Sequence, residues 1–271
     1  MDYYSHLQKS ARECLRGYWL RIIIAYAVWQ AASALAAVLI QFAVAVTGNY
    51  EDLAANVLIT LGMSVISLLI SSPLLIGFKS VIWHRCDGET PSLSLMAEPF
   101  ASAKRLFGCY ALRLLYYVLT ALPPVLLCAP AAVYYYLVKD GYSVVSGAID
   151  GIIKLCCTAL CITAVWLCVM LKMRYFAADY IFVSDDSVTA VQALRRSHEL
   201  TRGKSRYTFA LFCRFLPWLL LNVTGFAALY VEPYYNSAFC MYTRDLIKYE
   251  PKTEKNSGTA VFGAAGDGGQ A

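Results

Sequence analysis

The chain has 271 residues and a formal net charge of +5; 59% of its residues are hydrophobic and 15% are charged. Soluble domains are roughly 45–50% apolar and about 25% charged, so this composition excludes an ordinary soluble protein. We expect no nucleic-acid partner, because the excess positive charge is better explained by one face of a membrane protein, where anionic headgroups attract it.

The apolar residues come in long blocks, and the mean hydropathy of the chain is +0.53. Blocks of about 20 apolar residues match the roughly 30 Å hydrocarbon core of a bilayer at the rise of an α-helix. We therefore expect an all-α fold, a polytopic membrane helical bundle with about six transmembrane helices and both termini in the cytoplasm.

Residues 1–18 are predicted to form a cytoplasmic amphipathic helix. Leu7 and Leu15 lie on one side of this helix, whereas Lys9 and Arg12 lie elsewhere. Two interpretations stay open: the helix rests on anionic lipid at the interface, or it only leads into the first span.

The membrane domain is predicted to cover residues 19–248. Its six spans are expected at about 19–46, 56–83, 106–138, 151–173, 207–223 and 226–246. The last two spans require a turn at Thr224 and Gly225. A single span over 207–230 would leave too few apolar residues to cross the membrane again.

A cytoplasmic helix is predicted over 187–202, between the fourth and fifth spans. Asp186 or Ser187 is its expected N-cap, since side chains of these types bond the free N–H groups of a first turn. Val188, Val191 and Leu194 share one side of the helix. This apolar side is expected to dock under the bundle, to lie in the interface or to meet a partner.

The remaining segment, 249–271, is rich in Gly and Ala and shows no periodicity. Such a composition cannot bury enough apolar surface to fold, so we expect a disordered tail.

The Lys and Arg residues test the predicted topology. Of the 23 residues, Lys139 and Lys154 are the two that fall on the outer side, which leaves 23 − 2 = 21 on the cytoplasmic side. An asymmetry of this size follows the positive-inside rule. The sequence thus predicts a multi-pass protein of the bacterial plasma (inner) membrane.

Glu232 is the most informative single residue, because it precedes Pro233 inside the predicted last span. A carboxylate at that depth needs a partner, water or a proton, and a proline frees a backbone carbonyl for a polar site. Its candidate partners are Arg113, Arg214 and Asn222. The structural alternative is that Glu232 only forms an ion pair or reaches the interface, while the two arginines extend to the headgroups.

A basic segment follows the predicted cytoplasmic helix and overlaps its end. Its residues are candidates for binding lipid phosphate or a protein partner: Arg195, Arg196, Arg202, Lys204 and Arg206. A cluster that only sets the topology explains the same residues equally well.

We expect no enzyme activity, no cofactor and no metal site. His84 and Cys86 form an H-x-C pair, but a zinc site needs four ligands at suitable spacing. Ser197, His198 and Glu199 are adjacent on a helix, where neighbouring side chains point apart, so they do not form a catalytic triad.

Several segments carry a resemblance to a known family. They read RYFAADYIFVSDDSVTAVQALRRSHELTRGKSRYTFAL from Arg174, TGFAALYVEPY from Thr224, SPLLIGF from Ser72 and SLSLMAEPFASAKR from Ser92. Over most of residues 10–248 the chain resembles the bacterial integral-membrane family catalogued as domain of unknown function 975. The resemblance implies a multi-pass inner-membrane protein and supplies no activity, substrate or catalytic residue.

Two functions of different classes are consistent with these observations. The first is a non-enzymatic scaffold or accessory factor whose basic cytoplasmic face binds anionic lipid or a protein partner. The alternative is a small-molecule or lipid transporter with a site at the proline-broken last helix, next to Glu232.

Overall fold

The computed structural model describes residues 3–47, 53–139 and 147–249, and these ranges contain helices and no strand. The α-helices are α1 (Tyr3–Leu15), α2 (Trp19–Thr47), α3 (Leu53–Cys86), α4 (Ala103–Lys139), α5 (Gly147–Tyr175), α6 (Ala178–Ser184), α7 (Ala190–Thr201), α8 (Ser205–Leu220) and α9 (Ala228–Lys248). Short 3₁₀-helices occupy Leu93–Met96, Glu98–Phe100 and Leu221–Thr224. The predicted disordered tail, apart from Tyr249, lies outside the described residues.

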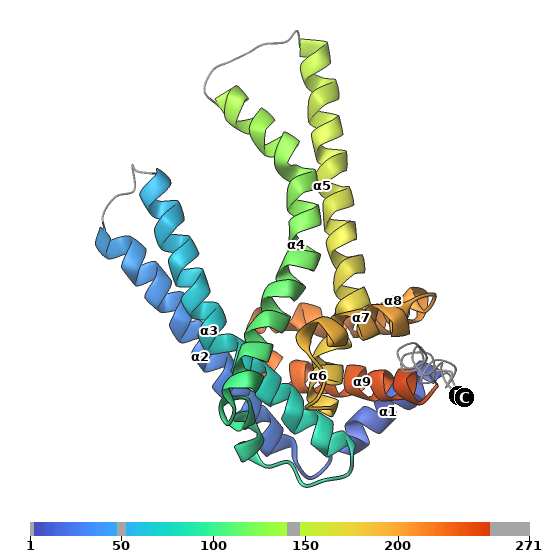
Figure 1. Cartoon of the computed structure of the whole chain (residues 1–271). Coiled ribbons are helices and arrows are strands. Elements are labelled where there is room, and N and C mark those ends of the chain that lie inside the picture. Colours follow the sequence, from blue (N-terminus) through green and yellow to red (C-terminus); the bar gives the residue numbers. More distant parts are fainter. Residues whose placement is uncertain (1–2, 48–52, 140–146, 250–271) are drawn as a thin grey trace, which may run out of the picture.

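Two long helical hairpins dominate the architecture. Helix α2 packs along α3, and α4 packs along α5. The hairpins rise side by side from a common foot and diverge away from it (Figure 1). We call this foot the base layer; it consists of α1, α6, α7, α8 and α9 together with the lower ends of α2 to α5 (Figure 1).

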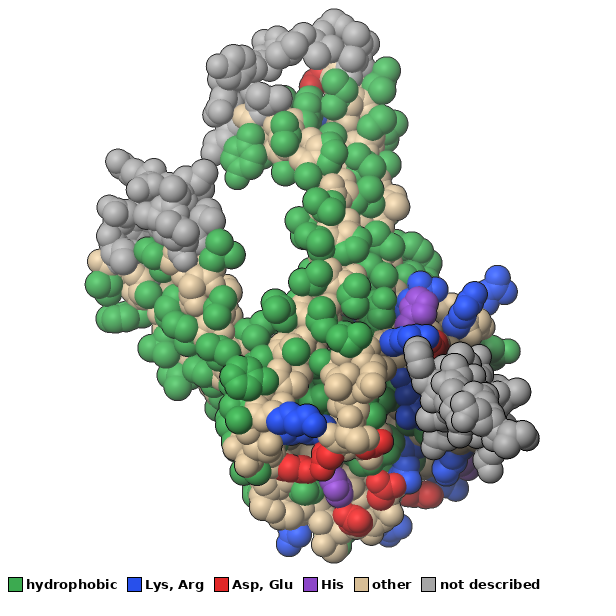
Figure 2. Space-filling model, viewed as in Figure 1, with side chains coloured by type: hydrophobic (Ala, Val, Ile, Leu, Met, Phe, Trp, Pro, Cys, Tyr) green, Lys and Arg blue, Asp and Glu red, His purple; other side chains and the backbone are tan. Residues whose placement is uncertain are grey.

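Four helical segments in the described ranges are long and apolar enough to cross a membrane: Trp19–Ala43, Ile59–Cys86, Ala103–Tyr136 and Asp150–Ser184. Their outward side chains are apolar; Leu35 is 61% exposed and Leu155 is 72% exposed. Figure 2 shows apolar side chains over both hairpins and charged ones gathered at the base layer. Apolar surface of this extent indicates a membrane protein, because it would be unfavourable in water.

The expected count of about six spans is not confirmed. Helix α8 has 16 residues, so it is about 24 Å long, shorter than the roughly 30 Å hydrocarbon core. Helix α9 has 21 residues, but it includes Glu232, Arg244 and Asp245. Both helices run across the direction of the hairpins (Figure 1). The turn between them does fall at Thr224 and Gly225, where Gly225 has a φ of +71° that favours glycine.

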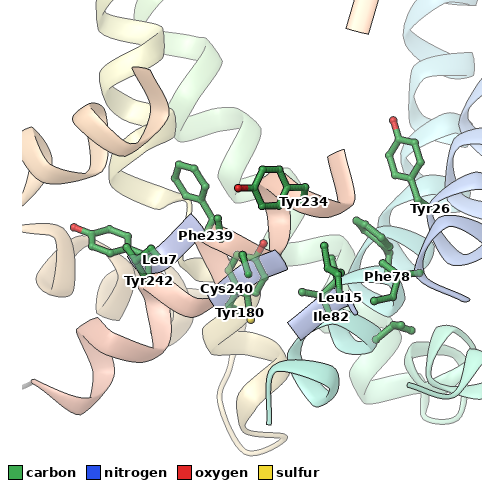
Figure 3. Close-up of a cluster of buried hydrophobic side chains, with 14 of the residues drawn as sticks. Leu7, Leu15, Tyr26, Phe78, Ile82, Tyr180, Tyr234, Phe239, Cys240 and Tyr242 are labelled. Atoms are coloured by element: carbon green, nitrogen blue, oxygen red, sulfur yellow. The ribbon is translucent and has the colours of Figure 1, made fainter. Parts of the chain in front are cut away.

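The base layer has its own aromatic core. Helix α1 places its apolar side in this core, with Leu7 at 2% and Leu15 at 0% exposure. These side chains lie among residues of the other elements, including Tyr180 and Phe239 (Figure 3). The apolar side of α1 is therefore covered by protein, and in this structure it is not free to rest on lipid.

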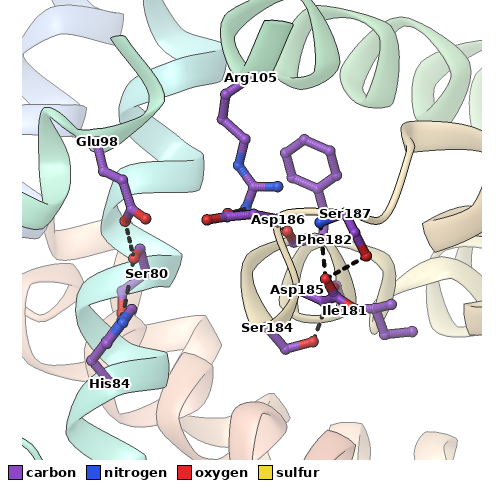
Figure 4. Close-up of polar contacts among 10 residues, drawn as sticks. All are labelled: Ser80, His84, Glu98, Arg105, Ile181, Phe182, Ser184, Asp185, Asp186 and Ser187. Atoms are coloured by element: carbon purple, nitrogen blue, oxygen red, sulfur yellow. Dashed lines mark hydrogen bonds and ion pairs between the residues drawn. The ribbon is translucent and has the colours of Figure 1, made fainter. Parts of the chain in front are cut away.

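Helix α7 begins at Ala190, three residues after the predicted start. The Asp185 carboxylate accepts hydrogen bonds from the backbone N–H and the hydroxyl of Ser187, at 2.8 and 2.7 Å, and this turn ends α6 (Figure 4). Thr189 is the N-cap in place of Asp186 or Ser187, and it forms a capping box with Gln192.

Candidate functional site

Glu232 lies in the base layer, on α9, and outside the four candidate spans of the described residues. Of its three predicted partners, the structure brings Asn222 to it: the Asn222 amide donates to Glu232 Oε1 at 3.0 Å. A second amide, that of Asn236, donates to Glu232 Oε2 at 3.3 Å. Neutral donors thus hold this carboxylate on both oxygens.

The two arginines proposed as partners of Glu232 contact other groups. Arg113 on α4 pairs with Asp179 on α6 at 2.9 Å, and both side chains are nearly inaccessible, at 7% and 11% exposure. The guanidinium of Arg214 on α8 lies 5.0 Å from the ring centroid of Tyr4. Of the candidate partners, the structure therefore shows Asn222 in contact with Glu232, Arg113 paired with Asp179, and Arg214 against the Tyr4 ring.

A buried lysine is the polar residue that the sequence argument missed. Lys79 on α3 is 9% exposed. Its ammonium donates to the Tyr180 hydroxyl at 3.0 Å and to the Asn236 side-chain carbonyl. The Tyr180 hydroxyl in turn donates to the backbone carbonyl of Asn236 at 2.8 Å.

Asn236 therefore bridges opposite charges, with its carbonyl on Lys79 and its amide on Glu232. A signal for both residues existed in the sequence. A lysine between apolar residues of a span, in IGFKSVIW, marks an intramembrane or interfacial charge, and Asn236 follows Glu232 at the i+4 spacing of one helix face.

The surroundings of Glu232 shift its titration. Burial raises the pKa of Glu232 above its ordinary value of 4.5, and the ammonium of Lys79 and the two amides oppose this rise. A carboxyl whose pKa is raised by folding contributes stability that is present at pH values below the unfolded pKa and is lost as the pH rises through the folded pKa.

We expect the variant Glu232→Gln to gain stability relative to the parent chain as the pH is raised from about 4 to 8, because glutamine carries no charge to desolvate. Glutamine also keeps an oxygen for the Asn222 amide. The measurement is the thermal unfolding midpoint of both proteins in uncharged detergent at a series of pH values. A difference between the two midpoints that stays constant over this range would contradict the argument.

The basic segment lies on the outside of the base layer. Arg195, Arg202 and Arg206 are exposed, and Arg195 forms an i,i+4 ion pair with Glu199 at 2.9 Å. Arg196 and Lys204 are half-buried. These five residues therefore extend from the middle of α7, through the turn that follows it, to the start of α8.

The apolar side of α7 is docked under the bundle. Ala193 and Leu194 are buried against α4 and α6, with Ser197 and Leu200 further along the same side. Val191, expected on this side, is 63% exposed. The buried side of α7 includes Ala190, Ser197 and Thr201, and Val191 lies about 100° around the helix from Ala190, at the margin of this side.

Polar contacts fix this docking. Arg105 on α4 donates to the backbone carbonyl of Phe182 at 2.5 Å and pairs with Asp186 at 3.2 Å (Figure 4). Its guanidinium also lies over the Phe182 ring, 4.1 Å from the centroid. The start of α4 therefore holds the loop that leads into α7.

We find neither a metal site nor a catalytic triad in the described ranges. No group of three or more His, Cys, Asp and Glu side chains there could hold a metal ion. Ser80, His84 and Glu98 do lie together, but Ser80 donates to Glu98 at 2.9 Å and His84 Nδ1 lies 2.9 Å from the backbone carbonyl of Ser80 (Figure 4). In a triad the carboxylate would orient the histidine instead.

Taken together, the fold defines an all-helical protein with four long apolar helices, consistent with a membrane protein, above a charged helical base. Comparison with family models identifies it further. The chain belongs to the family described as protein of unknown function (DUF975), whose model matches residues 1–250. No curated protein and no solved structure matches the chain.

Proposed function

We propose that this chain is a non-enzymatic accessory protein of the bacterial inner membrane, and that its basic face binds anionic lipid headgroups of the cytoplasmic leaflet. The two hairpins cross the bilayer, and the base layer with both termini lies at the cytoplasmic side. The basic face consists of Arg195, Arg196, Arg202, Lys204 and Arg206.

One observation carries this proposal: exposed arginines lie on the base layer, on helices that pack against the α4–α5 hairpin, whose surface is apolar. Arg202 and Arg206 make no ion pair with the described residues, so their charges are available. A basic residue near an anionic surface contributes about 1 kcal/mol to the attraction.

The exposed residues of α8 support the same placement. This helix presents Tyr207 near its start, and Leu216 and Trp218 in its second half, to the outside of the protein. A helix that carries arginines at its start and aromatic and apolar side chains further on suits the boundary between headgroups and acyl chains.

The test compares lipid preference in two variants that each lose two positive charges. The variant Arg202→Gln with Arg206→Gln changes the basic face, and Lys139→Gln with Lys154→Gln changes the opposite end of the hairpins. Each full-length protein is placed in uncharged detergent and titrated with phosphatidylglycerol or phosphatidylcholine, and binding is followed by thermal stabilisation.

We expect the arginine variant to lose at least about tenfold in apparent affinity for phosphatidylglycerol, from about 1 kcal/mol per residue. The lysine variant should keep the preference of the parent chain. Equal preference for phosphatidylglycerol in all three proteins would refute the proposal, and a partner protein would then be the better explanation of the basic face.

A further inference from the structure

A cavity of about 350 Å³ lies in the base layer where α3, α4, α5, α6, α8 and α9 meet. The buried Lys79 lines this cavity, and so do Lys172 at the lower end of α5, Asp179 and Asn236. None of the arginines of the basic face contributes to it. The cavity therefore differs from the surface discussed above.

The cavity carries an excess of positive charge. Lys79 bonds only neutral oxygens, those of Tyr180 and Asn236, and no carboxylate of the described residues lies within ion-pair distance of its ammonium. Lys172 is exposed and makes no hydrogen bond or ion pair with the described residues. The one carboxylate of the lining, Asp179, is already paired with Arg113.

Further polar groups can bond an anion in the same space. Tyr116 from α4 and Tyr235 from α9 line the cavity, and neither hydroxyl bonds another described residue. A phenol donates one hydrogen bond, and an ammonium up to three. Two ammonium groups and two phenols around one cavity match the several acceptor oxygens of a phosphate group.

The apolar part of the lining continues out of the cavity along α5. Val169 and Met173 line the cavity, and Trp166 and Ile162 continue the same side of the helix at spacings of three and four residues. Ile162 is 67% exposed and Trp166 is 54% exposed. This side runs from the base layer up the surface of the hairpin. An acyl chain whose headgroup lies in the cavity would extend along it.

We propose that this cavity is a discrete site for a phosphate-bearing anion, with Lys79 and Lys172 on the phosphate and α5 beside the acyl chain of an anionic phospholipid. A phospholipid and free phosphate share only the phosphate group, which the two lysines would bind in either ligand. The apolar side of α5 favours the phospholipid. The proposal does not rest on the function proposed for the basic face, since no residue is shared.

The experiment counts bound phosphatidylglycerol on the full-length protein in uncharged detergent by native mass spectrometry. We compare the parent chain with Lys79→Met and Lys172→Gln. The matched control is Lys154→Gln, which removes the same residue type from the other end of α5, where Lys154 pairs with Asp150 at 2.7 Å. The variant Arg202→Gln with Arg206→Gln separates this site from the basic face.

We expect one tightly retained phosphatidylglycerol per chain. The affinity for this first lipid should be at least about tenfold lower in Lys79→Met and in Lys172→Gln, and unchanged in the control and in the arginine variant, whose loss concerns the weaker binding of further lipids. Because Lys79 is buried, its substitution can impair folding; Lys172 is exposed, so its variant keeps the test valid. Unchanged retention in Lys172→Gln, or retention lost only in the arginine variant, would overturn the proposal.

A competition arm identifies the source of the phosphate. Inorganic phosphate is added at millimolar concentration to the lipid-loaded parent chain. Retained lipid supports the acyl-chain contact along α5. Displacement that again requires Lys79 and Lys172 supports the anion site and assigns it to free phosphate compounds instead.

Discussion

Replacing Arg113 by alanine is expected to destabilise the folded protein by about 3–5 kcal/mol. The substitution removes one partner of a pair that is nearly inaccessible to solvent and leaves the Asp179 carboxylate without its cation. An uncompensated buried charge of this kind carries a penalty of about this size. The measurement is the free energy of unfolding in mixed detergent micelles.

The control is Arg195→Ala. Its ion pair with Glu199 has the same N–O distance, 2.9 Å, but the Arg195 side chain is 81% exposed. Exposed i,i+4 pairs contribute only about 0.3–0.5 kcal/mol. If both substitutions cost the same, burial does not determine the strength of the Arg113–Asp179 pair.

Replacing Gly77 by alanine is expected to cost about 2–3 kcal/mol, the upper part of the range for overpacked cores. A Cβ atom at Gly77 would lie 2.6 Å from the backbone carbonyl oxygen and 2.7 Å from the Cα atom of Met96. Backbone atoms cannot rotate away as a flexible side chain does. The 3₁₀-helix Leu93–Met96 would therefore have to move off α3.

Gly62 provides the matched control, because it lies on the same helix and a Cβ atom there meets nothing within 4 Å. We expect Gly62→Ala to be neutral or slightly stabilising, since alanine favours a helix by up to about 1 kcal/mol over glycine. Unfolding measured for both variants in the same micelles tests the contact. A tolerated Gly77→Ala would show that the loop from Leu93 to Met96 does not pack on α3.

Part of the candidate site could be predicted from the sequence. The prediction singled out Glu232 and named Asn222 as a partner, and these two side chains do meet. It did not pair Arg113 with Asp179, because these residues are 66 positions apart and no local pattern pairs them. It also passed over Lys79, whose contact with Asn236 spans 157 residues.

Secondary structure could be predicted from the sequence, whereas contacts between distant residues could not, because only secondary structure depends mainly on neighbouring residues. Helix α7 was expected from its local signals, and only its start was displaced, by the turn at Asp185 and Ser187. Caps and turns depend on residues a few positions apart. Contacts such as that of Arg105 with Phe182 depend on how whole helices pack.

The amino-acid sequence by itself determined the helical class, the apolar hairpins and the one-sided distribution of charge, because hydropathy and charge add up over neighbouring residues. Tertiary structure alone decided that α8 and α9, which correspond to the expected fifth and sixth spans, pack in the base layer across the direction of the hairpins. These helices have intermediate hydropathy, so their place depends on the elements that cover them. Helices α1 and α3 pack on α9, and helix α5 packs on part of α8. Lys79 of α3 and residues of α5, α8 and α9 line the same cavity.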